Sequence, residues 1–295
     1  MRDSGPRQTG EMRTVRDLPA LRDAVGEARR EGRRIGFVPT MGALHDGHLS
    51  LVRSARADCG FAVVSIFVNP LQFSPGEDFE RYPRRLEEDA ALLESAGADL
   101  LYAPAAPSFY PPGFSTSVEV GGVTEGGEGA ARPGHFRGVA TVVAKLFLQV
   151  GPDAAYFGRK DLQQTAVIRR MVRDLDFPVR LVIGDTIREN DGLAMSSRNA
   201  LLSPEQRTRA AALPRALFHA RDRAASGQRD ARRLEEETRQ ELETAGLPVD
   251  YVEVVEMTSM ERAERAAPGA ALAAAVRLGK TRLLDNVVLE ERKTP

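Results

Sequence analysis

The chain has 295 residues, which is long enough for two domains with sizeable cores, since domains usually contain roughly 100 to 200 residues. Its 41 Lys and Arg residues balance 42 Asp and Glu residues, so the charge gives no reason to expect nucleic acid or an acidic membrane as a partner. The single cysteine, Cys59, excludes an internal disulfide framework and a cysteine-based zinc site, and it favours a cytoplasmic location. The longest apolar run, residues 139–150, is interrupted by Lys145 and is too short to cross a bilayer, and the N-terminus lacks the apolar core of a signal peptide. We therefore expect a soluble protein that acts on small molecules.

Residues 1–13 carry Gly, Pro and Gln without apolar periodicity, and we interpret them as a mobile tail. From residue 14 to residue 187, short apolar runs alternate with amphipathic helical patterns. This alternation predicts a parallel sheet with right-handed crossovers and helices on both faces, which is a doubly wound α/β domain. The predicted strands are residues 35–38, 61–68, 100–102, 154–157 and 179–183, and the predicted helices begin near residues 18, 47, 86, 139 and 161.

The pattern changes after Asn199, where helical stretches and then strand-like stretches follow one another closely. This order predicts a smaller α+β domain with an antiparallel sheet. We place the boundary between residues 185 and 190, which gives domains of residues 14–187 and 188–295. The predicted helices are residues 204–225 and 231–245, and the predicted strands are residues 251–256, 272–278 and 281–289.

The first predicted strand, residues 35–38, leads into a turn that carries two glycines and two histidines. Gly42 and Gly47 allow the backbone to turn tightly beneath an anion. A helix that begins near Gly47 would direct its unpaired N–H groups and its positive dipole end at a phosphate, with His45 and His48 as further donors. An ordinary strand-to-helix turn with histidines as caps is the alternative. The combination of glycines and histidines after a strand favours a nucleotide site.

Polar side chains also follow other predicted strands. Because ligands of open parallel sheets bind beyond the carboxyl ends of the strands, these side chains should converge. Lys160 and Arg198 suit the charge of a triphosphate, serine hydroxyls suit phosphoryl oxygens, and glutamines suit a small polar substrate. The side chains in question are Thr40, Met41, Asn69, Gln72, Lys160, Asp161, Gln164, Met195, Ser196, Ser197 and Arg198.

Other kinds of chemistry have weaker support. No Ser lies in a G-x-S-x-G elbow, which disfavours a Ser-His-Asp site. His45 and His48 lack the H-E-x-x-H spacing of a zinc site, and His219 falls in a predicted helix, where a structural role is favoured. Asp89 lies near the start of a predicted helix, and it either acts near Mg²⁺ with ATP or belongs to a solvated first turn.

The Gly-rich segment 121–138 is long for a compact domain, and it is either a functional flap or a disordered connection. Its charged residues Arg132, His135 and Arg137 are either surface charges or cations of a lid over phosphates.

Six segments carry a resemblance to one family. They are PTMGALHDGH at 39–48, FVNPLQF at 67–73, GHFRGV at 134–139, FGRKDLQQ at 157–164, GLAMSSRN at 192–199 and TRLLDN at 281–286. With these segments in this order, the chain resembles the pantoate:beta-alanine ligases from about residue 14 to residue 290. That family belongs to the nucleotidyltransferases with an H-x-G-H signature, and the MSSR segment is similar to their second, KMSKS-type signature. The resemblance implies a Rossmann-like N-terminal domain, a smaller C-terminal domain that closes over it, and a homodimer.

The resemblance also implies a reaction and a set of site residues. ATP and Mg²⁺ would act with the small-molecule substrates pantoate and β-alanine, through a pantoyl adenylate. By this resemblance, His48 would take the place of the family's catalytic histidine, and phosphate charge would be stabilised by His45, Lys160, Ser196, Ser197 and Arg198. Gln72 and Gln164 would bind pantoate, and Gln72 would also lie near β-alanine. The implied ATP-binding residues are Met41, Gly42, Ala43, Leu44, His45, Asp46, Gly47, His48, Gly158, Arg159, Lys160, Asp161, Ile187, Met195, Ser196, Ser197 and Arg198.

The chain departs from the family's common residues at four positions without losing a proposed catalytic group. Arg159 replaces Glu, Leu162 replaces Tyr, Ile187 replaces a frequent Val, and Asp46 replaces a frequent Glu. Arg159 adds charge beside Lys160, and its side chain either points away from ATP or strengthens phosphate binding. Two other functions stay open at this point, namely a nucleotidyltransferase that keeps its nucleotide product and a nucleotide-sensing regulator on the same fold.

Overall fold

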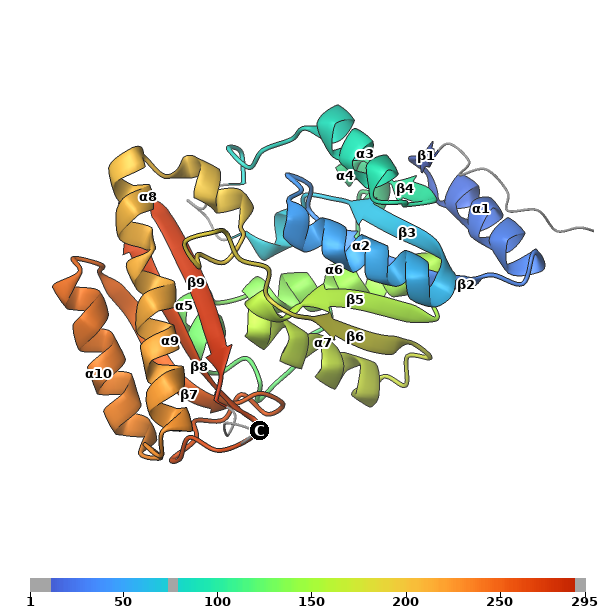
Figure 1. Ribbon diagram of the computed structural model, residues 1–295. Coiled ribbons are helices and arrows are strands. Elements are labelled where there is room, and N and C mark those ends of the chain that lie inside the picture. Colours follow the sequence, from blue (N-terminus) through green and yellow to red (C-terminus); the bar gives the residue numbers. More distant parts are fainter. Residues whose placement is uncertain (1–11, 74–78, 290–295) are drawn as a thin grey trace, which may run out of the picture.

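Two units lie side by side in the computed structural model, which describes residues 12–73 and 79–289 (Figure 1). Buried apolar side chains of the larger unit form two clusters that run from Val15 to Met171. Those of the smaller unit form a separate cluster from Leu193 to Leu289. The apolar core of the larger unit therefore ends, and that of the smaller unit begins, on either side of the predicted boundary at residues 185–190. Within the described residues, no helix combines the length and the apolar character that crossing a membrane requires.

The larger unit is built on a six-stranded parallel sheet in the order β1-β4-β3-β2-β5-β6. The chain moves outward from β2 through β3 to β4 and then returns to β5 on the other side of β2. Such a reversal opens a crevice at the carboxyl ends of the two neighbouring strands, here β2 and β5. The doubly wound fold predicted from the sequence is thus confirmed. The strands are β1 (Arg13–Val15), β2 (Arg34–Thr40), β3 (Gly60–Ile66), β4 (Leu100–Tyr102), β5 (Ala154–Gly158) and β6 (Arg180–Gly184).

The clearest differences from the sequence prediction concern β1 and β2. Arg13, assigned to a mobile tail, begins β1 and pairs with Leu100, while residues 1–11 of that tail lie outside the described residues. The strand β2 continues through Pro39 to Thr40, where we expected Pro39 to end it. On one side β5 pairs only with Gly36 and Phe37 of β2, so the proline lies beyond that part of the ladder, where a missing N–H costs little.

Helices cover both faces of this sheet, as Figure 1 shows. Apolar side chains of α1, α6 and α7 join one cluster with Phe37, and those of α2 and α3 join the other with Val38. The two neighbouring residues of β2 point to opposite faces, because side chains alternate along a strand. The helices are α1 (Leu18–Arg30), α2 (Asp46–Cys59), α3 (Leu86–Ser95), α6 (His135–Val150) and α7 (Leu162–Asp174).

The smaller unit has an antiparallel sheet in the order β7-β8-β9, as predicted, with α9 and α10 packed on one face. Its other face contacts the larger unit, where Val255 and Ala271 pack against Leu162. The helix predicted over residues 204–225 is divided at Ala211. The elements are α8 (Pro204–Ala210), α9 (Ala212–Ala225), α10 (Ala231–Thr244), β7 (Val249–Glu256), β8 (Ala270–Leu278) and β9 (Thr281–Val288).

The Gly-rich segment 121–138 is ordered and adds the short helix α5 (Gly127–Ala131) before α6. Gly138, in the first turn of α6, lies against the short turn η1 (Pro70–Gln72). A Cβ atom on Gly138 would lie 2.2 Å from the carbonyl oxygen of Leu71, so only glycine permits this contact. The contact brings the turn that carries Gln72 against the helix. Three further short helices are α4 (Ala106–Phe109), η2 (Arg159–Asp161) and η3 (Ser197–Leu201).

Candidate functional site

A cleft of about 270 Å³ lies at the carboxyl ends of β2 and β5 and is lined by residues of both units. Most of the predicted site residues line it, although they come from distant parts of the chain. The predicted residues in the lining are Thr40, Met41, His45, Gly47, His48, Asn69, Gln72, Gly158, Lys160, Asp161, Gln164, Ile187, Met195, Ser196, Ser197 and Arg198. Gly42, Ala43, Leu44, Asp46, Asp89 and Arg159 are not among the lining residues.

The loop between β2 and α2 is held from behind by the buried carboxylate of Asp89. Its Oδ2 accepts the N–H of Ala43 at 2.9 Å, and its Oδ1 accepts the N–H of Leu44 at 2.8 Å. Gly42 has a φ of +83°, and a Cβ atom there would lie 2.9 Å from Asp89 Oδ2. The sequence did not anticipate this role of Asp89. Its proposed role near Mg²⁺ stays a prediction.

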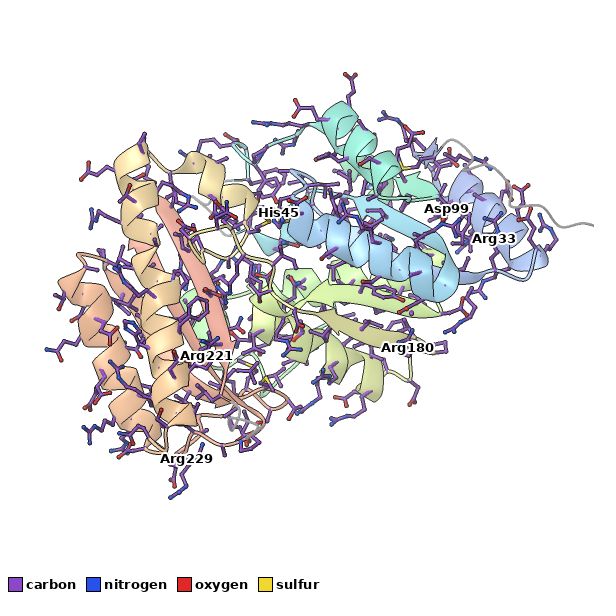
Figure 2. The ribbon with its side chains drawn as sticks, in the orientation of Figure 1. Arg33, His45, Asp99, Arg180, Arg221 and Arg229 are labelled. Carbon is purple, nitrogen blue, oxygen red and sulfur yellow. The ribbon has the colours of Figure 1, made fainter. Side chains whose placement is uncertain are left out.

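His45 and His48 lie close together at the start of α2, which begins at Asp46, slightly earlier than expected. Figure 2 labels His45 at this end of the helix. The two ring centroids lie 4.1 Å apart, and the backbone N–H of His45 donates to Nδ1 of His48 at 3.4 Å. Gly47 leaves room for the His45 ring, since a Cβ atom there would lie 2.9 Å from its Cε1. The Nδ1 atom of His45 is buried without a hydrogen-bond partner. The pair thus retains polar atoms that a ligand could bind.

Both histidines are neutral at pH 7. Desolvation, assisted by the charge of Lys160, lowers the pKa of His45 to about 4. Desolvation, assisted by His45, lowers the pKa of His48 to about 3. The sequence predicts both rings as donors beside a phosphate, and in this geometry each is a neutral ring that has one N–H to donate.

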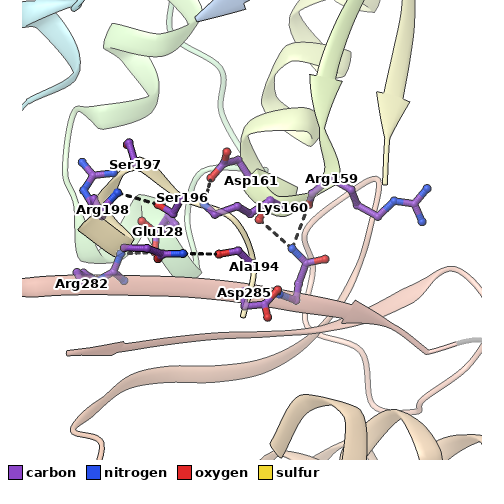
Figure 3. A network of polar contacts seen from close by, with 12 residues as sticks. Glu128, Arg159, Lys160, Asp161, Ala194, Ser196, Ser197, Arg198, Arg282 and Asp285 are labelled. Carbon is purple, nitrogen blue, oxygen red and sulfur yellow. Dashed lines mark hydrogen bonds and ion pairs between the residues drawn. The ribbon is translucent and has the colours of Figure 1, made fainter. Parts of the chain in front are cut away.

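The turn η2 separates two basic side chains that are adjacent in sequence. Lys160 Nζ lies 3.3 Å from Asp161 Oδ1 at the cleft, whereas Arg159 Nη2 pairs with Asp185 Oδ1 at 3.0 Å. Figure 3 shows the Arg159 side chain directed away from Lys160 and Ser196. Desolvation alone would raise the pKa of Asp161, but the charges of Lys160 and Arg198 hold it below its usual value. The turn therefore presents one cation and one carboxylate to the cleft.

The segment after β6 brings hydroxyl and guanidinium groups to the same cleft. Ser196 Oγ accepts the N–H of Arg198 at 3.3 Å, and Ser197 Oγ lies 3.4 Å from the hydroxyl of Tyr82. The N–H of Met195 donates to the carbonyl of Ile187 at 3.0 Å, which closes the loop between them. In Figure 3, Ser196 lies near Lys160 and Asp161.

Gln72 is buried and is held by both its side chain and its backbone. Asn69 Nδ2 donates to its Oε1 at 3.0 Å, and His135 Nδ1 donates to its carbonyl oxygen at 2.8 Å. Arg132 donates to the same carbonyl at 3.3 Å. Arg132 and His135, which the sequence left open as surface charges or lid cations, therefore line the cleft and hold Gln72.

Two neighbouring glutamines on α7 have different surroundings. Gln163 Nε2 donates to the carbonyls of Val123 and Gly126, and its Oε1 accepts the N–H of Glu128. Gln164 lines the cleft, and its side chain makes no hydrogen bond to the described part of the chain. Gln163 thus fixes the Gly-rich segment, while the side chain of Gln164 is available to a ligand.

Contacts from β9 of the smaller unit were not anticipated as parts of the site. Asn286, on β9, donates to two carbonyls of η2, and Arg282 pairs with Glu128 of α5. The signal in the sequence was the segment TRLLDN, in which polar residues interrupt an apolar strand pattern. That segment contributed to the resemblance, but its individual residues received no role.

The cleft combines donors for anions with an apolar wall formed by Val139, Val143, Leu146 and Phe157. Across residues 12–73 and 79–289, no three His, Cys, Asp or Glu side chains are grouped to hold a metal ion. Such a cleft could hold a nucleotide beside a small, partly apolar acid.

The chain is similar to known proteins over almost its whole length. A family model described as pantoate-beta-alanine ligase matches residues 13–288. The chain is 53% identical over 280 residues to a pantothenate synthetase of Heliobacterium modesticaldum. The matched region covers 95% of this chain and 100% of the relative. A crystal structure of pantothenate synthetase from Thermus thermophilus matches with a TM-score of 0.90 and 49% identity, over 95% of this chain and 100% of that one. A Francisella tularensis pantoate-beta-alanine ligase, complexed with beta-gamma ATP and beta-alanine, matches with a TM-score of 0.80 and 31% identity, over 94% of this chain and 98% of that one.

Proposed function

Because this chain belongs to the pantoate-beta-alanine ligase family, we propose that its cleft holds the triphosphate of ATP and pantoate side by side. The chain catalyses the ATP-dependent condensation of pantoate with β-alanine to pantothenate, AMP and pyrophosphate, through a pantoyl adenylate. The two alternatives that the sequence left open, a nucleotidyltransferase that keeps its product and a nucleotide sensor, therefore lose their basis.

The observation that carries the proposed site is the convergence of His45, Lys160 and Ser196 on one cleft from three distant segments. In the first half-reaction, a carboxylate oxygen of pantoate attacks the α-phosphorus, and the bond to pyrophosphate breaks. Negative charge develops on the phosphoryl oxygens, which Lys160 neutralises and the serine hydroxyls stabilise by donation. His45 and His48 act as neutral donors, because their pKa values are low.

In the second half-reaction, the unprotonated amine of β-alanine attacks the acyl carbon of pantoyl adenylate, AMP leaves and the amine loses a proton. Gln164 and Gln72 are assigned to the polar groups of pantoate, and the apolar wall that includes Val143 is assigned to its methyl groups. Holding both substrates in line supplies much of the rate enhancement, because proximity replaces a bimolecular encounter.

Magnesium and the assembly state are further parts of the proposal. Mg²⁺ bound to the triphosphate would neutralise more of the charge that develops at the α-phosphorus. We infer that ATP carries the metal into the cleft, in keeping with a donor set that suits anions. We also infer a cytoplasmic homodimer, from the resemblance and from the single, buried cysteine Cys59.

The proposal is tested by measuring pyrophosphate release from ATP, Mg²⁺ and pantoate before β-alanine is added. The wild type should release pyrophosphate only when pantoate is present. Lys160→Ala and His48→Ala should each lower this rate by at least about 100-fold, since each removes a group from the charged centre. Lys280→Ala and His219→Ala, at positions outside the cleft, serve as matched controls. Near-normal release by either cleft variant would refute the role of that residue.

A further inference from the structure

Asn286 connects the smaller unit to the turn that carries Lys160. Its side chain is only 4% exposed, and it lies near the end of β9. The amide nitrogen Nδ2 donates to the carbonyl oxygen of Arg159 at 3.0 Å and to that of Lys160 at 2.9 Å (Figure 3). Both amide hydrogens are thus directed at the backbone of η2 and not at a ligand. A residue of the smaller unit therefore holds the backbone of the larger unit at the turn that carries Lys160.

The preceding residue, Asp285, fixes the start of the other phosphate-site segment. Its carboxylate, 1% exposed, binds Arg188 through two hydrogen bonds of 2.6 and 3.0 Å. Arg188 in turn donates to the carbonyls of Gly192 and Asn286 at 3.0 and 3.2 Å. Arg188 also pairs with Ala194 in an isolated β-bridge, directly before the segment that contains Ser196. Asp285 and Asn286 are further joined by a backbone N–H that donates to Oδ1 at 2.7 Å.

We infer that Asn286 is a positioning residue, which together with Asp285 sets Lys160 in register with Ser196 across the boundary between the two units. The inference rests on the proposed role of Lys160 at the phosphates. Its physical basis is that a small displacement of Lys160 from the developing charge lowers the rate of the chemical step strongly. The binding of pantoate, assigned to Gln164, does not depend on that displacement. Loss of Asn286 should therefore lower kcat far more than it raises KM for pantoate.

The test measures pantoate-dependent pyrophosphate release for Asn286→Ala, for Asn286→Ser and for Asn286→Ala combined with Lys160→Ala. Asn286→Ala should lower kcat about 10-fold to 100-fold, with KM for pantoate changed less than about threefold. Asn286→Ser keeps one donor, so its kcat should lie between those of Ala and Asn, and it replaces the Ala variant should that fail to fold. In the Lys160→Ala background, Asn286→Ala or Asn286→Ser should add little further loss, because Asn286 acts through Lys160.

Thr238→Val is the structural control. Thr238 is buried in α10 of the same unit, and its hydroxyl donates to the carbonyl of Leu234 at 2.7 Å, away from the cleft residues. This variant loses a buried hydrogen bond and should lower the melting temperature while leaving kcat unchanged. A full kcat in Asn286→Ala, or losses that multiply with Lys160→Ala, would overturn the inference and leave the proposed function standing. Wild-type turnover of Lys160→Ala would instead overturn the proposed role of Lys160 and this inference with it.

Discussion

The two cleft histidines make the stability of the protein sensitive to pH. In the folded chain the pKa values of His45 and His48 are lowered to about 4 and about 3, whereas an unfolded histidine titrates near 6.5. Between these values the unfolded chain binds more protons, so the free energy of unfolding decreases as the pH falls below about 6.5. From pH 7 to pH 5, we expect a loss on the order of 2 kcal/mol for each histidine. Urea unfolding at several pH values measures this loss.

The matched substitutions are His45→Gln and His219→Gln. His45→Gln removes one of the two depressed groups, so the loss of stability between pH 7 and pH 5 should become smaller. His219 lies outside the cleft, and its Nδ1 lies 2.9 Å from Glu241 Oε2. Its substitution should leave unchanged the pH dependence of stability that comes from the two cleft histidines. An unchanged pH dependence in His45→Gln would show that the ring is not held neutral by its surroundings.

Residues at strand ends could be predicted from the sequence, whereas residues that hold them could not. Lys160 and His48 lie in the segments that follow two apolar runs, and the topology of a parallel sheet brings such segments to one edge. Asn286 binds backbone carbonyls and Glu128 pairs with Arg282, and in both cases the partners lie more than 120 positions apart. Contacts of this kind produce no periodic pattern in the sequence. The direction of the Arg159 side chain likewise depended on Asp185, whose place the sequence did not fix.

The loop between β2 and α2 depends on the first turn of α3, because both carboxylate oxygens of Asp89 accept its backbone N–H groups. Asp89→Asn replaces one acceptor with an NH₂ group that faces another donor. We expect this variant to lose about 1 to 3 kcal/mol of stability and to raise KM for ATP at every Mg²⁺ concentration. Steady-state kinetics over a range of Mg²⁺, together with urea unfolding, measure both effects.

The neighbouring carboxylate provides the control for that experiment. Glu88, whose side chain is 69% exposed, pairs with Arg85 at the surface, so Glu88→Gln should change neither stability nor KM for ATP. Unchanged stability of Asp89→Asn, combined with a greater requirement for Mg²⁺, would favour the metal role predicted from the sequence over the role in holding the loop.

Element types were predicted more accurately than element ends, and the reasons are visible in the contacts. The strands and helices of the larger unit follow from apolar periodicity, which the chain carries locally. The three-residue strand β1 was missed because its pairing with β4 depends on a segment about 85 positions away. The start of α2 at Asp46 depends on how His45 and His48 pack, which periodicity does not report.

The two units are joined across the cleft by a buried ion pair between Glu128 of α5 and Arg282 of β9. The side chains are 9% and 15% exposed, respectively, and the hydroxyl of Tyr251 donates to Glu128 Oε1 at 3.1 Å. Arg282 also pairs with Asp250. Since Gln163 binds the N–H of Glu128, this contact links the smaller unit to α7 through the Gly-rich segment. The position of that segment over the cleft thus depends on both units.

Removal of one partner from this pair should cost more than removal of both. Arg282→Met leaves the buried Glu128 carboxylate without a guanidinium, and we expect a loss of about 3 to 5 kcal/mol. Adding Glu128→Gln should recover part of this loss, because the unpaired carboxylate is then removed, while Asp250 keeps its ion pair with Arg277. The exposed pair Arg233 and Glu237 on α10 is the control, and Arg233→Ala should leave the melting temperature nearly unchanged, because solvent screens this pair. Melting temperatures of these variants measure the difference in stability. A double variant less stable than Arg282→Met would mean that the charges are solvated and that apolar packing alone joins the two units.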